Sequence, residues 1–125
     1  MTAVLLVEDD VALREVLAEA LRAEGHVVQI CRNPAELTDH SLHRADTVAV
    51  VDAWGNSHLE LLEPERLSIE KLASALPTIM VTGRAWAEQI DAVELGLLGL
   101  LPKPADLEDL LALVRAVRPV ERTPF

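Results

Sequence analysis

A doubly wound α/β domain, with one parallel sheet between two layers of helices, is the fold that this 125-residue sequence predicts. Short aliphatic and β-branched runs alternate with longer segments whose apolar residues recur at helical spacing. This alternation is typical of a three-layer α/β sandwich. The length is that of one domain, and at this size the common order of five strands is 2-1-3-4-5.

The predicted strands are the short runs of aliphatic and β-branched residues. The first four are expected to be buried on both faces, because helices cover both sides of a parallel sheet. In chain order, the strands are expected at Val4–Val7, Val27–Ile30, Thr47–Val51, Thr78–Val81 and Leu98–Leu101.

Two helical segments flank the second strand. Val11–Glu24 carries an apolar stripe at helical spacing, with Asp10 as a good N-cap and Gly25 as a good C-terminal stop. A short helix is expected near Pro34–His40, where Asn33 precedes a proline at the first helical position.

Three more helices are expected in the second half of the chain. One lies within His58–Ala75 and is expected to begin near Glu65, because Pro64 does not fit inside a helix. The next is expected at Ala85–Leu95, and the last at Ala105–Val117.

The charge and the cysteine content narrow the class of protein. The chain has 11 Lys and Arg against 21 Asp and Glu, a net charge of −10, and this field repels nucleic-acid phosphates. Cys31 is the single cysteine, which excludes a disulfide framework. No apolar stretch approaches the roughly 18 residues that span a bilayer, and the N-terminus has no signal-peptide pattern. We therefore expect a soluble, cytoplasmic domain that contacts neither nucleic acid nor membrane.

Aromatic residues are scarce, since Trp54, Trp86 and Phe125 are the only Phe, Trp or Tyr. The core is therefore expected to be aliphatic, with Cys31 as a small buried hydrophobic residue. The histidines show no metal-ligand pattern and are expected to be solvated: His26, His40, His43 and His58.

Polar side chains follow the carboxyl ends of four predicted strands. Glu8 and Asp9 follow the first strand, Asp52 the third, Thr82 the fourth and Lys103 the fifth. Ligands of open α/β sheets bind at this edge, where the first and third strands are neighbours. We therefore expect the three carboxylates to converge on one pocket, with the hydroxyl and the ammonium on its far side.

This set of groups fits metal-assisted phosphoryl transfer. Three close carboxylates repel one another unless a cation offsets them, and hard oxygen ligands suit Mg²⁺. A hydroxyl and an ammonium opposite the metal suit a phosphoryl group, with one carboxylate as the nucleophile that forms an acyl phosphate. Each residue also has a plainer interpretation. The acids at 8–10 could simply favour a helix N-terminus, and Lys103 could be a surface lysine.

Four short segments, taken in their order and spacing, resemble the receiver domain of bacterial two-component response regulators. They are VLLVEDD at 4–10, VVD at 50–52, IMVTG at 79–83 and LPKP at 101–104. The resemblance covers nearly the whole chain, and it implies a flavodoxin-like (βα)5 fold. It also implies a receiver domain over residues 1–118, with 119–125 as a tail or the start of a linker.

The resemblance assigns roles to these residues. Asp52 would accept a phosphoryl group from a histidine kinase or phosphotransfer protein. Mg²⁺ would be held by the carboxylates of Glu8, Asp9 and Asp52 and by the backbone carbonyl of Trp54. Thr82 and Lys103 would stabilise the phosphoryl group. The domain would not be an enzyme on an external substrate, although it would assist its own phosphotransfer and dephosphorylation.

The sequence departs from the family pattern around this site. The family usually has a switching aromatic ring three residues before the lysine, where this chain has Leu100. Trp54 stands in an atypical loop after the phosphoacceptor and could shield it or lie on the surface. Arg84 could contact a phosphoryl group, although we expect it to be solvated. Leu97 and Leu98 replace residues that are usually acidic and exposed.

Apolar residues at this place predict an interface. If Leu97, Leu98 and Leu100 are exposed, they form a patch for a homodimer or an effector. The departures also support an alternative function, in which a degenerate receiver acts as a constitutive interaction module. A phosphohydrolase is disfavoured because Trp54 replaces the second acid it would need. A dinucleotide-binding enzyme is disfavoured because no glycine-rich turn follows the first strand.

Overall fold

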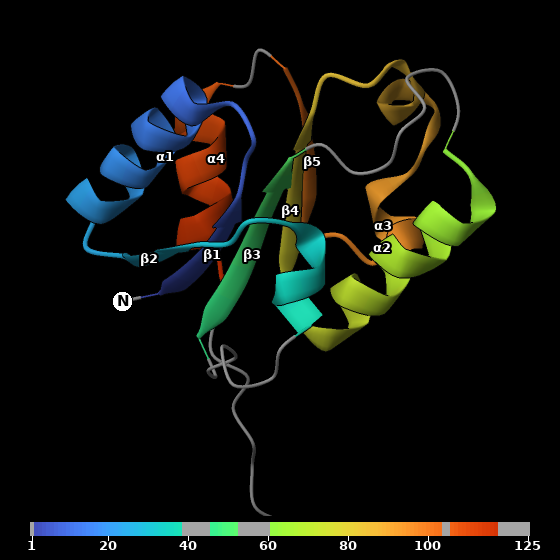
Figure 1. Cartoon of the computed structure of the whole chain (residues 1–125), viewed down its shortest axis with the longest axis horizontal. Helices are drawn as coiled ribbons and strands as arrows, with labels where there is room; N and C mark the ends of the chain where they lie inside the picture. The colour runs from blue at the N-terminus through green and yellow to red at the C-terminus, as the bar shows by residue number, and fades with distance from the viewer. Residues whose placement is uncertain (1, 39–45, 53–60, 104–105, 118–125) are drawn as a thin grey trace, which may run out of the picture.

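In the computed structural model, five parallel strands form one sheet in the order β2-β1-β3-β4-β5 (Figure 1), which confirms the predicted fold class. The structure describes residues 2–38, 46–52, 61–103 and 106–117. The strands are β1 (Ala3–Val7), β2 (Val27–Ile30), β3 (Thr47–Asp52), β4 (Thr78–Thr82) and β5 (Gly99–Pro102).

Helices cover both faces of the sheet. Helices α1 and α4 lie on one face, and η1, α2, η3 and α3 lie on the other (Figure 1). No helix in the described part of the chain is long and apolar enough to cross a membrane. The α-helices are α1 (Val11–Ala23), α2 (Glu63–Ala75), α3 (Ala92–Leu95) and α4 (Leu107–Arg115), and the 3₁₀ helices are η1 (Pro34–Thr38) and η3 (Ala85–Gln89).

Side chains alternate between the two cores, one on each face of the sheet. Along β1, for example, Leu6 packs with α1 and α4, whereas Leu5 packs with the layer that contains α2. Trp86 belongs to the second core and is only 1% exposed. The prediction of a purely aliphatic core was therefore wrong, because the η3 segment turns this indole inward. Cys31 is buried, as predicted.

Local signals explain where the helices begin and end. The Asp10 carboxylate accepts a hydrogen bond from the Leu13 amide at 3.1 Å and caps α1, as predicted. Gly25 follows α1 with φ +87°, a left-handed conformation that favours glycine. Helix α2 begins two residues before the predicted Glu65, because a proline is tolerated in the first helical turn, where Pro64 lies.

The second predicted strand is not buried on both faces. Val27 and Ile30 of β2 are exposed, because β2 is the edge strand and pairs with β1 alone. On one side of β2, the predicted helix Pro34–His40 is a short 3₁₀ helix, Pro34–Thr38, and its predicted last residue lies outside the described residues. This element covers less of the strand than a full helix would.

The predicted helix Ala85–Leu95 is divided into two short pieces. The 3₁₀ helix η3 ends at Gln89, and Ile90 has an extended backbone with φ −108° and ψ 152°. Asp91 then starts α3, because its carboxylate accepts a hydrogen bond from the Val93 amide at 2.9 Å.

Two predicted surface features are also different in the structure. Leu97 is only 6% exposed and packs in the core, so it does not belong to an exposed patch, whereas Leu98 is 41% exposed and Leu100 is half-buried. His26 was predicted to be solvated, but its side chain is largely buried next to Glu24. The other histidines lie outside the described residues.

Candidate functional site

The register of the sheet brings the predicted site residues to one edge. Val7 of β1 pairs with Val51 of β3, so the next residues along, Glu8 and Asp52, lie side by side. In the same way, Asp52 pairs with Val81, which precedes Thr82 in β4. Thr82 in turn pairs with Pro102, which precedes Lys103. The parallel strands therefore deliver their polar residues to one site.

Three carboxylates meet at this edge. One oxygen from each of Glu8, Asp9 and Asp52 lies within 4.8 Å of the other two. Glu8 is 3% exposed and Asp52 is 7% exposed, whereas Asp9 faces solvent. Two buried acids this close to a third are unfavourable without positive charge, which makes the cluster a candidate cation site.

Lys103 supplies part of that charge. Its Nζ lies 2.7 Å from Asp52 Oδ2 and 3.3 Å from Glu8 Oε2. Burial alone would lower the pKa of Lys103, but the hydrogen bond to Asp52 and the charges of both acids outweigh it and raise the pKa above its usual value. The lysine is therefore held as an ammonium next to the two buried carboxylates.

Glu8 is the carboxyl of the cluster whose ionised form is least favourable. Burial, with a smaller contribution from the hydrogen bond to Asp52, raises the pKa of Glu8 from 4.5 to about 7. The Asp10 amide donates to Glu8 Oε1 at 3.0 Å, and this bond opposes the shift. One ammonium therefore does not balance the negative charge at this site.

The donor set fits Mg²⁺. Glu8 Oε2 is buried and, apart from its ion pair with the Lys103 ammonium at 3.3 Å, meets no hydrogen-bond donor among the described residues, so this oxygen can still serve as a ligand. All three side chains offer hard carboxylate oxygens, the type of ligand that Mg²⁺ prefers. The predicted fourth ligand, the backbone carbonyl of Trp54, lies outside the described residues.

Thr82 is buried at the end of β4, on the far side of the site. Its Oγ accepts a hydrogen bond from the Arg84 amide at 3.0 Å, so the hydroxyl hydrogen can point elsewhere. Arg84 itself is half-buried rather than fully solvated as we had expected. The bond orients the Thr82 hydroxyl and ties it to the backbone of the following loop.

A hollow of about 250 Å³ lies next to Thr82. Leu100 lines it together with Arg84 and Lys103, so the position predicted to lack an aromatic ring borders empty space. Trp86, which was not predicted as a core residue, is buried four residues after Thr82. The sequence signal for a core position is a large apolar side chain inside a predicted helix of a chain that has only three Phe, Trp or Tyr residues.

A parallel sheet of this order, with an acidic pocket at its carboxyl edge, defines a flavodoxin-like α/β domain. The model of the response regulator receiver domain family matches residues 4–115. This chain therefore belongs to the response regulator receiver domain family.

Individual relatives agree with this assignment. The acid tolerance regulatory protein ActR of Sinorhizobium medicae is 36% identical over 94% of this chain and 60% of its own length. The response regulator MprA of a Mycobacterium species is 31% identical over 91% of this chain and 49% of its own. The chain thus spans about half to three fifths of these relatives. The solved non-phosphorylated HemR receiver domain from Leptospira biflexa is 28% identical, with a TM-score of 0.66 over 97% of this chain and all of that one.

Proposed function

We propose that this chain is a phosphorylatable receiver of a two-component system, with Asp52 as the phosphoacceptor. The observation that carries the proposal is the contact of Lys103 Nζ with Asp52 Oδ2 at 2.7 Å, beside two further carboxylates. An Asp52 oxygen would attack the phosphorus of a phosphohistidine on a histidine kinase or phosphotransfer protein. The new O–P bond would form an acyl phosphate as the N–P bond breaks, and the imidazole would leave with the electron pair and take up a proton.

The acidic residues would prepare the site for this reaction. Glu8, Asp9 and Asp52 would hold Mg²⁺ together with the Trp54 backbone carbonyl, and the ion would offset the charge of the incoming phosphoryl oxygens. Glu8 and Asp52 are buried, so water solvates their charges poorly and a cation would stabilise them. Glu8 Oε2 supports this assignment, because it is buried and its one partner among the described residues is the Lys103 ammonium at 3.3 Å.

Thr82 and Lys103 would respond to the phosphoryl group. Lys103 would exchange its contact with the Asp52 carboxylate for one with a phosphoryl oxygen, since its three N–H groups can serve several acceptors. The Thr82 hydroxyl would donate to another phosphoryl oxygen. Because the Arg84 amide donates a hydrogen bond to Thr82 Oγ, any movement of this hydroxyl would either break that bond or shift the loop after β4.

A chemical phosphodonor tests the proposal directly. The chain is incubated with Mg²⁺ and acetyl phosphate, and intact mass is measured before and after Asp52→Asn. We expect a gain of one phosphoryl group that needs both Mg²⁺ and Asp52. A matched Asp46→Asn variant should still gain it. A mass gain that survives Asp52→Asn would contradict the assignment of the phosphoacceptor.

The second candidate is a degenerate receiver that acts as a constitutive interaction module. The hollow next to Leu100 favours it, because no ring is present there to move with Thr82. Absence of an Asp52-dependent adduct with acetyl phosphate or beryllofluoride would support this function over the first.

The wider role follows from the same proposal. The chain would work in the cytoplasm as a switch rather than as an enzyme on an external substrate. Residues 1–118 would form the receiver, and 119–125 a tail or linker. An effector or a second copy would read its state around Leu98 and Leu100, since Leu97 is part of the core.

A further inference from the structure

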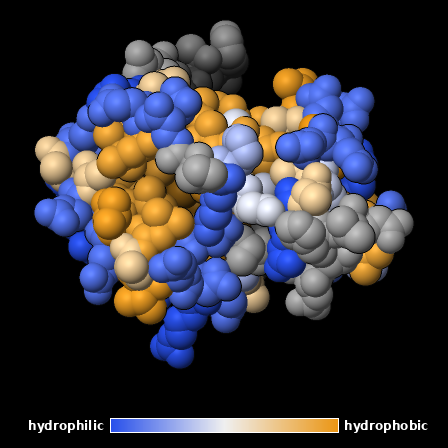
Figure 2. Space-filling view, turned by 90° about the horizontal axis from the view of Figure 1, so that it is seen from above, coloured by the Kyte–Doolittle hydropathy of each residue, from blue (hydrophilic) through white to orange (hydrophobic). Residues whose placement is uncertain are grey.

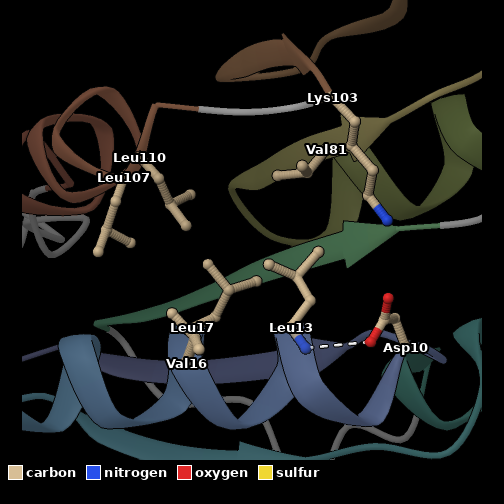
Figure 3. Close-up of a pocket in the computed structure, with 8 residues that line it drawn as sticks. All are labelled: Asp10, Leu13, Val16, Leu17, Val81, Lys103, Leu107 and Leu110. Carbon is tan, nitrogen blue, oxygen red and sulfur yellow. Dashed lines mark hydrogen bonds between the residues drawn. The ribbon is translucent and has the colours of Figure 1, made fainter.

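A buried tryptophan lies on the same side of the sheet as the Thr82 side chain. Successive side chains of a strand point to opposite faces. Val81 of β4 faces the hollow between α1 and α4 (Figure 3), so the side chain of Thr82 is directed to the other face, where Trp86 packs in the second core. Seen from the carboxyl edge of the sheet, the broad apolar area of the surface lies over α1 and α4 (Figure 2), on the opposite side from Trp86. The indole is 1% exposed and belongs to the interior.

The backbone of Arg84 connects the Thr82 hydroxyl to the turn that carries this indole. The Arg84 amide donates a hydrogen bond to Thr82 Oγ at 3.0 Å. The Arg84 carbonyl accepts a hydrogen bond from the Ala87 amide at 3.2 Å, in the first turn of η3. Trp86 lies inside that turn, between the two residues that this second bond joins. The hydroxyl and the indole are therefore connected through one residue that is hydrogen-bonded on both sides.

The turn has space on one side and packed core on the other. Ala85 and Ala87, the neighbours of Trp86, line the hollow of about 250 Å³ next to Thr82, which leaves room for η3 to shift. The hydrogen bonds of a 3₁₀ helix have poorer geometry than those of an α-helix, and η3 ends before the extended backbone at Ile90. Because protein interiors are close-packed, a shift of η3 must move the buried indole against its neighbours in the core.

We propose that Trp86 is a positioning residue that couples the Thr82 hydroxyl to the second core. This inference rests on the proposed phosphorylation of Asp52. When the hydroxyl turns toward a phosphoryl oxygen, the partly buried Arg84 amide follows it rather than lose its acceptor, and η3 shifts with the amide. The environment of the indole then changes. Leu100 of β5 packs against the same core, so the change extends to the fifth strand.

Fluorine NMR tests the proposal on the intact chain labelled with 5-fluorotryptophan. The chain has two tryptophans, and the Trp86→Phe variant identifies the resonance of Trp86. Beryllofluoride, whose fluorine atoms stand in for the phosphoryl oxygens, is added together with Mg²⁺. Its bound fluorines give their own signal, so the same spectrum reports occupancy of Asp52 and the state of the indole. We expect the Trp86 resonance to shift by more than its linewidth as the bound signal saturates.

Two substitutions of Arg84 test the path of the coupling. Arg84→Pro removes the amide donor, and the φ of −72° at this position is one that proline can adopt. At saturating beryllofluoride this variant should lose the shift of the Trp86 resonance. Arg84→Ala is the matched control, because it removes the same side chain but keeps the amide, and it should shift as the wild type does.

The outcomes separate this inference from the proposed function. No bound beryllofluoride signal in the wild type would overturn the phosphorylation of Asp52 and this inference with it. A bound signal with an unmoved Trp86 resonance would overturn the inference alone. An equal shift in the Arg84→Pro and Arg84→Ala variants would overturn it as well, because the signal would then reach the indole without the Arg84 amide.

Discussion

Substituting Glu8 should change how the stability of the metal-free protein depends on pH. The folded state raises the pKa of Glu8 to about 7 from an ordinary 4.5. A carboxyl with a raised pKa binds its proton more tightly when folded. Its stabilising contribution is therefore complete below about pH 4.5 and is lost as the pH rises through about 7.

The size of the effect follows from the shift. One pKa unit corresponds to about 1.4 kcal/mol, so the free energy of unfolding should fall by on the order of 2–3 kcal/mol across this window. Glu8→Gln removes the titrating group but keeps an oxygen to accept the Asp10 amide. This variant should lack the fall and should be more stable than the wild type at pH 8 without metal.

Urea unfolding, followed by circular dichroism in EDTA at pH 5 and pH 8, measures this difference. Glu19→Gln, an exposed substitution on α1, controls for the loss of one surface charge. Addition of MgCl₂ at pH 8 should stabilise the wild type and leave the Glu8→Gln variant nearly unchanged. Parallel pH profiles for Glu8→Gln and the wild type would refute the argument, because the buried carboxyl would then not carry the shift.

Four further substitutions test the packing around the site. Trp86→Ala should lower the free energy of unfolding by about 3–5 kcal/mol, because it empties a fully buried site; a loss below about 1 kcal/mol would contradict this. Gly99→Ala would place a Cβ 2.6 Å from Leu113 Cδ1, so thermal unfolding should show a loss of about 1 kcal/mol as that leucine shifts. Gly83→Ala meets only ordinary contacts and should show none. Leu100→Phe should fill the adjacent hollow without loss of stability in urea, and a destabilised variant would show that the hollow cannot admit a ring.

The strand order and the site could be predicted because both depend on a simple rule. Apolar runs of strand length, separated by helices, define a parallel sheet, and the residue after each run then lies at the carboxyl edge. Glu8, Asp52, Thr82 and Lys103 were found in this way, from four separate parts of the chain. The same order also makes β2 an edge strand, so its exposed residues were predictable from the topology, although its composition indicated burial.

The break in the predicted helix Ala85–Leu95 depended on weaker local signals. Asp91 is a good N-cap residue, and its position in the middle of the segment is the one sequence signal that a helix restarts there. Helical periodicity alone did not reveal the extended backbone at Ile90, because apolar residues of both pieces face the same core.

The burial of Leu97 has a local cause as well. Gly96 ends α3 with φ +78°, and the Leu97 amide then donates to the Ala92 carbonyl at 2.9 Å. In this type of helix ending, a hydrophobic residue after the glycine commonly packs back on the helix. The sequence Gly96–Leu97 therefore indicated a buried leucine. We had predicted exposure instead, because the family usually has an acidic, exposed residue at this position.

Lys103 gives the two hollows a common boundary. Its side chain lines the hollow next to Leu100 and also a hollow of about 520 Å³ between α1 and α4, while its ammonium group contacts Glu8 and Asp52. This one side chain thus borders three neighbouring sites: the two hollows and the acidic pocket. A change in the rotamer of this lysine would therefore alter the walls of both hollows at the same time as its contacts with the two acids.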